Sequence, residues 1–153
     1  MNVHPPYGQV GQMNFRRRTF LKLIGGAAAA NACTAGGVPP ANVGDVTAGN
    51  ASALAVGSLE AVAGEPVCVG RDAKGVYAMT LICTHQGCDM GRQGTVSPSG
   101  LFCGCHGSEF DVDGNVVRGP ASSPLAHFAV SADASGNLTV HTGSEVDPST
   151  RTV

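Results

Sequence analysis

The feature that most constrains this sequence is a pair of short segments rich in cysteine and histidine. The first reads C-T-H-Q-G-C at 83–88 and the second reads C-G-C-H-G-S at 103–108. They hold four of the six cysteines and two of the five histidines. Each segment follows an apolar run, so its polar side chains are expected in a loop at the end of a strand, where a β-scaffold holds them rigidly. The fold must therefore bring two loops together around a shared centre.

The spacing within the two segments predicts a metal centre. C-x-H in the first and C-x-x-H in the second place one thiolate and one imidazole per loop within reach of a common centre. The four predicted ligands are Cys83, His85, Cys103 and His106. A structural zinc site is one interpretation, because two cysteines and two histidines commonly bind zinc. Zinc does not explain the second cysteine in each loop, Cys88 and Cys105, or the Gly-Ser pair that follows in the second loop.

The two segments closely resemble the signature of the Rieske family, C-x-H-x-G-C followed by C-x-C-H-G-S. The resemblance covers roughly residues 60–142. It implies one 2Fe–2S cluster per chain, with Cys83 and Cys103 on one iron and with His85 and His106 on the other. It also implies a disulfide between the two remaining loop cysteines, Cys88 and Cys105, which is a natural pairing in an exported protein. Neutral imidazoles on one iron raise the reduction potential to about −150 to +300 mV.

Four further residues are expected around the cluster by the same resemblance. Ser108 matches a serine that donates its hydroxyl to a cluster sulfide in high-potential members, although a loop serine can also satisfy only local backbone groups. Phe110 stands where quinol-oxidising members carry a tyrosine. Because phenylalanine cannot donate, the potential is expected below that of those relatives. Gly107 belongs to the second signature, and Gly119-Pro120 resembles the proline loop that covers a third side.

Several positions depart from the family pattern or have no assigned role. Gln86 stands where those relatives usually have leucine and Gly104 where they have proline, so a more polar and more flexible cover is expected. Cys68 lies in an alternating strand-like run and is expected to be a buried core thiol. His127 and His141 are expected to be structural or surface residues.

Residues 1–32 read as an export signal. The run R-R-T-F-L-K at 17–22 resembles a twin-arginine signal, and it is followed by a short apolar stretch and by A-N-A at 30–32. This predicts a periplasmic protein. A retained membrane anchor is disfavoured because the apolar stretch has eight residues, whereas a spanning helix needs about 20. Membrane association through a lipidated Cys33 is a second alternative, weakened because Ala30 stands where leucine is usual.

The rest of the chain predicts a linker followed by one small β-domain. Residues 33–50 are rich in glycine, proline and small polar residues and are expected to form a flexible linker. Residues 51–153 contain short strand-like runs around turn signals at 72–75, 113–115 and 132–137. Nothing shows a helical period over three turns. The expected fold is all-β: a Rieske-like antiparallel β-sandwich or open barrel with a two-loop cluster-binding subdomain.

Charge and motif content narrow the function. From residue 33 onward five basic residues face eleven acidic ones, a net charge of −6. A basic face is what nucleic acid requires, so nucleic acid is not expected as a partner. No nucleophile or general base is evident elsewhere, which favours an electron-transfer protein or subunit that passes single electrons to a redox partner. The candidates are a small periplasmic carrier with a cytochrome partner, the Rieske subunit of a cytochrome bc-type quinol oxidase complex, and the small subunit of a periplasmic molybdenum oxidoreductase with a large catalytic chain.

Overall fold

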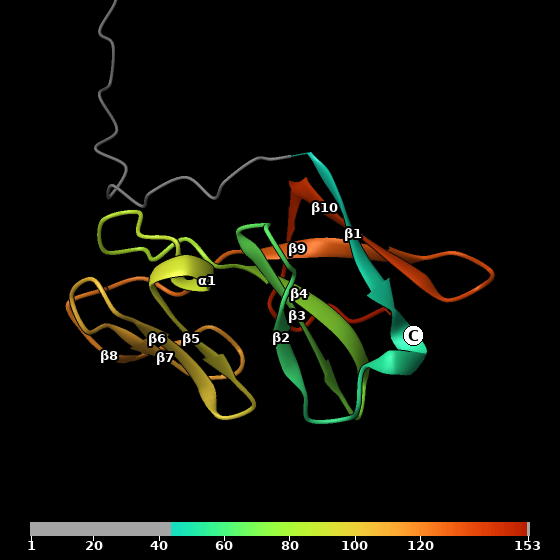
Figure 1. Ribbon diagram of the computed structural model, residues 1–153. Coiled ribbons are helices and arrows are strands. Elements are labelled where there is room, and N and C mark those ends of the chain that lie inside the picture. The colour runs from blue at the N-terminus through green and yellow to red at the C-terminus, as the bar shows by residue number, and fades with distance from the viewer. Residues whose placement is uncertain (1–43, 153) are drawn as a thin grey trace, which may run out of the picture. The chain divides into compact units, whose positions relative to one another are not determined.

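The computed structural model describes residues 44–152, and these form two antiparallel sheets (Figure 1). The larger sheet has six strands in the order β1-β10-β9-β4-β3-β2. Its strands are β1 (Asp45–Asn50), β2 (Leu59–Ala61), β3 (Val67–Asp72), β4 (Gly75–Thr80), β9 (His127–Ala132) and β10 (Asn137–Val146). A single 3-10 turn, η1 (Ala51–Ala53), links β1 to the segment before β2. No helix among residues 44–152 is long and apolar enough to cross a membrane.

The smaller sheet is inserted in the chain between β4 and β9. Its four strands, in spatial order, are β5 (Gly94–Ser97), β6 (Gly100–Cys103), β7 (Glu109–Phe110) and β8 (Val116–Arg118). A four-residue helix, α1 (Met90–Gln93), precedes them. Asp89 caps α1 by accepting a hydrogen bond from Gly91 N at 2.9 Å, and the Met90 side chain is fully buried. The insertion carries both cysteine- and histidine-containing loops.

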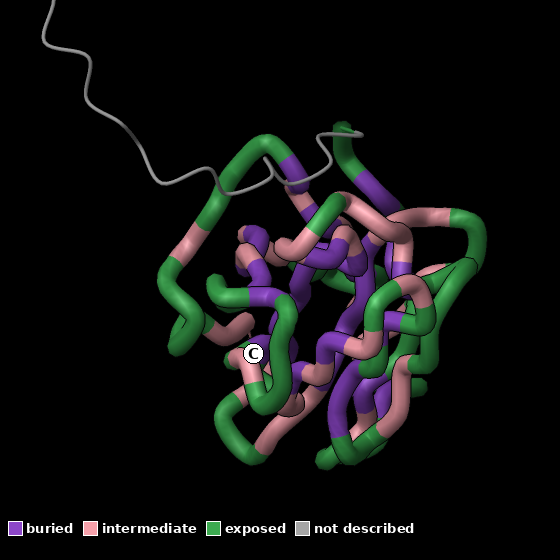
Figure 2. Tube along the Cα trace, turned by 90° about the vertical axis from the view of Figure 1, so that its left-hand side faces the viewer, coloured by how far each residue is buried: buried purple, intermediate pink, exposed green. Residues whose placement is uncertain are grey.

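The hairpin of β3 and β4 separates two cores, which is why most of its residues are buried whichever face they are on. Figure 2 shows the buried stretches of the chain crossing the middle of the domain, with exposed stretches around them. Val67 and Val69 contribute to a core with β1, β9 and β10, while the alternate residue Cys68 contributes to the core that packs against the smaller sheet. Side chains of a strand point alternately to opposite faces, so one hairpin serves both cores. Cys68 is fully buried, as predicted, and burial raises the pKa of its thiol to about 12.

The predicted fold class is confirmed. All three predicted hairpins form, at the β3–β4, β7–β8 and β9–β10 turns. The linker prediction was wrong at its end, since residues 45–50 pair with β10 as strand β1. The side chains of Val46 and Ala48 are buried on one face of β1. Two buried positions among small residues form too short an alternation to be recognised as a strand from the sequence. The predicted signal, Cys33 and the first part of the linker lie outside the described residues.

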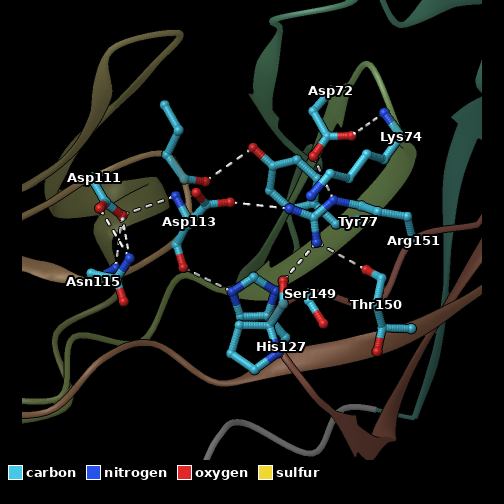
Figure 3. Close-up of polar contacts among 12 residues, drawn as sticks. Asp72, Lys74, Tyr77, Asp111, Asp113, Asn115, His127, Ser149, Thr150 and Arg151 are labelled. Carbon is cyan, nitrogen blue, oxygen red and sulfur yellow. Dashed lines mark hydrogen bonds and ion pairs between the residues drawn. The ribbon is translucent and has the colours of Figure 1, made fainter.

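A C-terminal arginine connects the two sheets (Figure 3). Arg151 has a side chain only 9% exposed and binds Asp72 of the β3–β4 turn at 2.7 Å and Asp113 of the β7–β8 turn at 3.1 Å. Its guanidinium lies 4.3 Å from the centre of the Tyr77 ring. The Tyr77 hydroxyl donates to Val112 O at 3.0 Å, which is a second link to the smaller sheet. We call Arg151 and its two carboxylate partners the C-terminal clasp.

Candidate metal centre

The two loops share one backbone design. In the first, Cys83 N donates to Cys88 O at 2.8 Å and Gly87 N donates to Cys83 O at 2.9 Å. The second loop, residues 103–108, repeats both bonds at its equivalent positions, at 2.8 Å and 2.9 Å. The turns need a positive φ, +74° at Gly87 and +82° at Gly107, which explains the glycine in each signature. These closed turns present the side chains between each cysteine and its glycine in fixed directions.

The structure places the four predicted ligands as two pairs. Cys83 and Cys103 are 1% and 0% exposed, and they lie close enough for Cys103 to raise the pKa of the Cys83 thiol. The rings of His85 and His106 meet edge to face with their centres 4.8 Å apart. His85 is half-buried, whereas His106 is exposed. The thiols therefore lie at the inner end of the site and the second imidazole at its outer end.

An unpaired buried atom supports metal binding at this site. His85 Nδ1 is buried and has no hydrogen-bond partner among the described residues. A buried polar atom without a partner is costly unless something binds it, and a metal ion would do so. Burial raises the pKa of the Cys83 thiol, and the neighbouring Cys103 raises it further. Metal ions bind the thiolate form of cysteine, so a cation at the site would offset the free-energy cost of ionising this buried thiol. The donors present fit a mixed thiolate and imidazole centre.

The predicted disulfide between Cys88 and Cys105 is confirmed. The sulfur atoms of both residues and of Cys103 all lie within 4.8 Å of one another. Because two of these three sulfurs are bonded to each other, they are not thiolate ligands, and Cys103 is the member of this group that remains a metal donor. The bridge fastens the two loops beside the predicted ligands.

Ser108 connects the second loop to the proline loop, residues 119–125. It is fully buried, and its hydroxyl oxygen accepts a hydrogen bond from Ala121 N at 3.0 Å. The hydroxyl also acts to lower the pKa of the Cys83 thiol. Sequence reasoning missed Thr84, whose hydroxyl donates to Ser123 O at 2.7 Å and ties the first loop to the proline loop. A threonine at position 84 gives no signal in the sequence that it makes this contact.

The remaining predicted neighbours take different positions. Phe110 is 2% exposed and packs in the core that also contains both ligand cysteines. Pro120 is exposed, and Ala121 beside it supplies the buried contact. Gln86 is exposed, consistent with a polar cover. Gly104 is held in place, since its N–H donates to Gln93 O at 2.8 Å. The contact made by Gln93 was not predicted, because the sequence around this residue shows no recognisable motif or periodicity.

This fold and site define a small all-β metalloprotein whose centre is bound between two disulfide-linked hairpin loops. The Rieske [2Fe-2S] domain matches residues 44–129. This is more than half of the chain, so the chain belongs to the Rieske family and binds a 2Fe–2S cluster. The residues of this site fit such a cluster because they include two neighbouring thiols, two imidazoles and the unpaired His85 nitrogen.

Curated relatives are similar over part of their length. The chain is 42% identical over 80 residues to the cytochrome b6-f complex iron-sulfur subunit of Synechococcus sp. (strain RCC307), covering 51% of this chain and 42% of that protein. It is 37% identical over 92 residues to the same subunit of Synechococcus sp. (strain CC9605), covering 58% and 50%. The match thus spans about half the length of these relatives or less.

Two solved structures illustrate the similarity of this chain to known proteins. One is the cyanobacterial plasma membrane Rieske protein PetC3 from Synechocystis PCC 6803, at 28% identity and TM-score 0.44, covering 62% of this chain and 97% of that one. Another is the ferredoxin of carbazole 1,9a-dioxygenase from Nocardioides aromaticivorans IC177, at 25% identity and TM-score 0.44, covering 64% and 97%.

Proposed function

We propose that this chain passes single electrons through its 2Fe–2S cluster, as a small carrier or redox subunit. When bound, the cluster supplies a one-electron couple. The observation that carries the proposal is the exposure gradient of the predicted ligands, from fully buried Cys103 to exposed His106. An exposed imidazole gives a partner protein an approach to the centre, while buried thiols keep the other end away from solvent.

The ligand assignment is tested by removing the exposed histidine. We expect His106→Ala to lose the optical and electron paramagnetic resonance spectrum of a Rieske centre, because one iron loses a nitrogen ligand. His141→Ala is the matched control: His141 is partly exposed on β10, hydrogen-bonded to Ser131 and Asp45, and outside the site. The control should keep the full spectrum. A His106→Ala protein with an unchanged Rieske spectrum would show that the ligand set is wrong.

A second candidate is the Rieske subunit of a quinol-oxidising complex, because the curated relatives are cytochrome b6-f iron-sulfur subunits. The buried Phe110, where quinol-oxidising members have tyrosine, supports the carrier instead. Fractionation of native membranes separates the two. Co-purification with a cytochrome b establishes the complex, and recovery with a large molybdenum-containing chain establishes a small-subunit role.

The proposed location is the periplasm, through the twin-arginine signal in residues 1–32. The support is the order of the arginine pair, the apolar stretch and the A-N-A site in the sequence. Replacing Arg17 and Arg18 with lysine should retain the protein in the cytoplasm, as measured by cell fractionation. Undiminished export of this variant would refute that route.

A further inference from the structure

The outer face of the larger sheet brings together polar side chains from three neighbouring strands. Strand β10 lies between β1 and β9 (Figure 1). Asp45 of β1 is the direct partner of His141 of β10. On its other side His141 is paired with the small residue Ala129, and Ser131 follows two positions along β9. The residues that alternate with these polar ones are valines that pack in the core underneath: Val46, Val140 and Val130.

These three polar side chains form one continuous chain of hydrogen bonds. His141 Nδ1 lies 2.9 Å from Asp45 Oδ1, and His141 Nε2 lies 2.8 Å from Ser131 Oγ. A carboxylate can only accept, so His141 Nδ1 carries the proton of this bond. In the neutral imidazole the other nitrogen, Nε2, is then bare and accepts from the Ser131 hydroxyl. The chemistry of the groups therefore fixes the direction of both bonds.

This order of groups is one that activates a serine as a nucleophile. The hydroxyl is bonded to a base, and the base is oriented by a third group, the carboxylate. The His141 side chain is 33% exposed and is thus largely shielded by its neighbours, while Ser131 is exposed and open to a reagent. A positioned general base contributes about 10²- to 10⁴-fold to a rate. Asp45 is 67% exposed and screened by water, which favours the lower end of this range.

We propose that Ser131 is a covalent modification site for activated acyl esters, with His141 as its general base and Asp45 as the positioning residue of His141. Ser131 Oγ attacks the acyl carbon while its proton passes to His141 Nε2. The bond from the acyl carbon to the leaving oxygen then breaks, and the imidazolium returns the proton to that oxygen. The products are one O-acylated serine and one alcohol or phenol. This inference does not depend on the electron-transfer proposal, because the cluster takes no part in the step.

The reactivity can be measured on the unaltered protein. The cluster-loaded full chain is incubated with p-nitrophenyl acetate, quenched in acid and mapped by peptide mass spectrometry over time. Ser149 is an internal comparison, because it is also exposed and its hydroxyl donates to the Asp147 carboxylate at 2.6 Å, with no imidazole in that contact. Ser131 is expected to be acetylated at least about tenfold faster than Ser149. Equal rates at the two serines would overturn the proposal without any variant.

Variants then test the two residues behind Ser131. His141→Gln keeps a hydrogen-bonding amide but removes the base, so the acetylation rate of Ser131 should fall about tenfold or more, toward that of Ser149. Thr47→Ala, at an exposed position on the same face of β1, is the matched control and should keep the full rate. A retained Rieske spectrum shows that each variant is folded. An unchanged rate in His141→Gln would refute the role of the imidazole.

The role of Asp45 is tested by loss and rescue. Asp45→Ala should lower the acetylation rate of Ser131 severalfold, because His141 loses the group that fixes its orientation and its tautomer. Asp45→Glu restores a carboxylate that can accept from Nδ1 and should recover most of this loss. A merely structural contribution of Asp45 would not be rescued in this way. An Asp45→Glu protein that is no faster than Asp45→Ala would refute the positioning role.

Discussion

At the scale of single residues, the environment of the predicted ligands explains how one hydroxyl can tune the centre. The Ser108 oxygen accepts from Ala121 N, which leaves its own proton free to be donated, and the hydroxyl acts to lower the pKa of the Cys83 thiol. A donor at a ligand sulfur stabilises the reduced, more negative state of an iron–sulfur centre. Burial strengthens such a bond because no water competes for the sulfur.

Ser108→Ala is therefore expected to lower the midpoint potential. A net hydrogen bond contributes about 1 kcal/mol, and 59 mV corresponds to a factor of ten for a one-electron couple, so the decrease should be on the order of 50 mV. Redox titration followed by electron paramagnetic resonance measures it. Ser122→Ala, an exposed serine of the proline loop, is the control and should leave the potential unchanged. An unaltered midpoint potential in Ser108→Ala would show that the Ser108 hydroxyl does not affect the centre.

The disulfide was predictable from the sequence, and the four ligands remain a prediction from the same two loops, because the spacing there is local and chemically restrictive. Gln93 and Thr84 were not, because each acts through a contact to a segment distant in the chain, at Cys105 and Ser123. Common polar residues carry no pattern that reports such contacts. The flexibility expected at Gly104 was inferred from glycine standing where relatives have proline, whereas the Gly104 N–H is held by its hydrogen bond to Gln93 O.

At the scale of secondary-structure elements, the residues in the turns determined which hairpins could be predicted from the sequence. The β3–β4 and β9–β10 turns contain aspartates that accept from backbone N–H groups, as Asp72 does from Lys74 at 2.7 Å and Asp133 does from Ser135 at 2.8 Å. Such turns mark hairpins in the sequence. Strands β2 and β5 have only three and four residues and no clear alternation, so nothing local announces them.

The C-terminal clasp makes a prediction at this scale. Arg151→Met keeps an apolar stem over Tyr77 but removes the charge shared by Asp72 and Asp113, so the free energy of unfolding should fall by about 2 kcal/mol, allowing for the partly exposed carboxylates. Urea denaturation measures this. Arg118→Met is the control, because that ion pair to Glu109 is on the surface, with side chains 69% and 39% exposed, and should change stability little. Equal losses in the two variants would contradict the clasp.

The clasp also has a pH signature. Burial alone would raise the pKa of Asp72, but the hydrogen bonds and charge of Arg151, with backbone N–H groups, hold it below its usual value. A carboxyl with a lowered folded pKa contributes stability above its unfolded pKa, and that contribution is lost as the pH falls through the folded value. The Arg151→Met loss should therefore be largest near neutrality and shrink in acid.

At the scale of the whole molecule, the two cores share the β3–β4 hairpin, and the polar contacts of the C-terminal clasp hold the two sheets together. His127 lies at this junction, 3% exposed, with Nε2 at 2.9 Å from Asp113 O and its ring stacked near Tyr77. Because Asp113 O can only accept, His127 Nε2 carries the proton and the buried Nδ1 remains bare. The division into two cores could not be read from the sequence, since a strand buried on both faces shows only a continuous apolar run.

His127 predicts how global stability depends on pH. Burial lowers the pKa of His127 below its ordinary value of 6.5, and the positive charge of Arg151 lowers it further, against the opposing effect of the bond to Asp113. Between pH 6.5 and the lower folded pKa the unfolded chain binds a proton that the folded chain does not, so the free energy of unfolding falls as the pH drops through this range. Above pH 6.5 the histidine is neutral in both states and stability is retained in full.

His127→Gln tests this origin, because the glutamine amide can still donate to Asp113 O but does not titrate. Urea unfolding of the cluster-loaded protein from pH 8 to pH 5 should show a destabilised variant at pH 8, where packing is lost, and a gap to the unaltered protein that narrows toward pH 5. His141→Gln, at a partly exposed site on β10, serves as the comparison for general effects of removing a histidine. A gap for His127→Gln that stays constant across the whole range would mean that the buried imidazole does not set the acid limit of the fold.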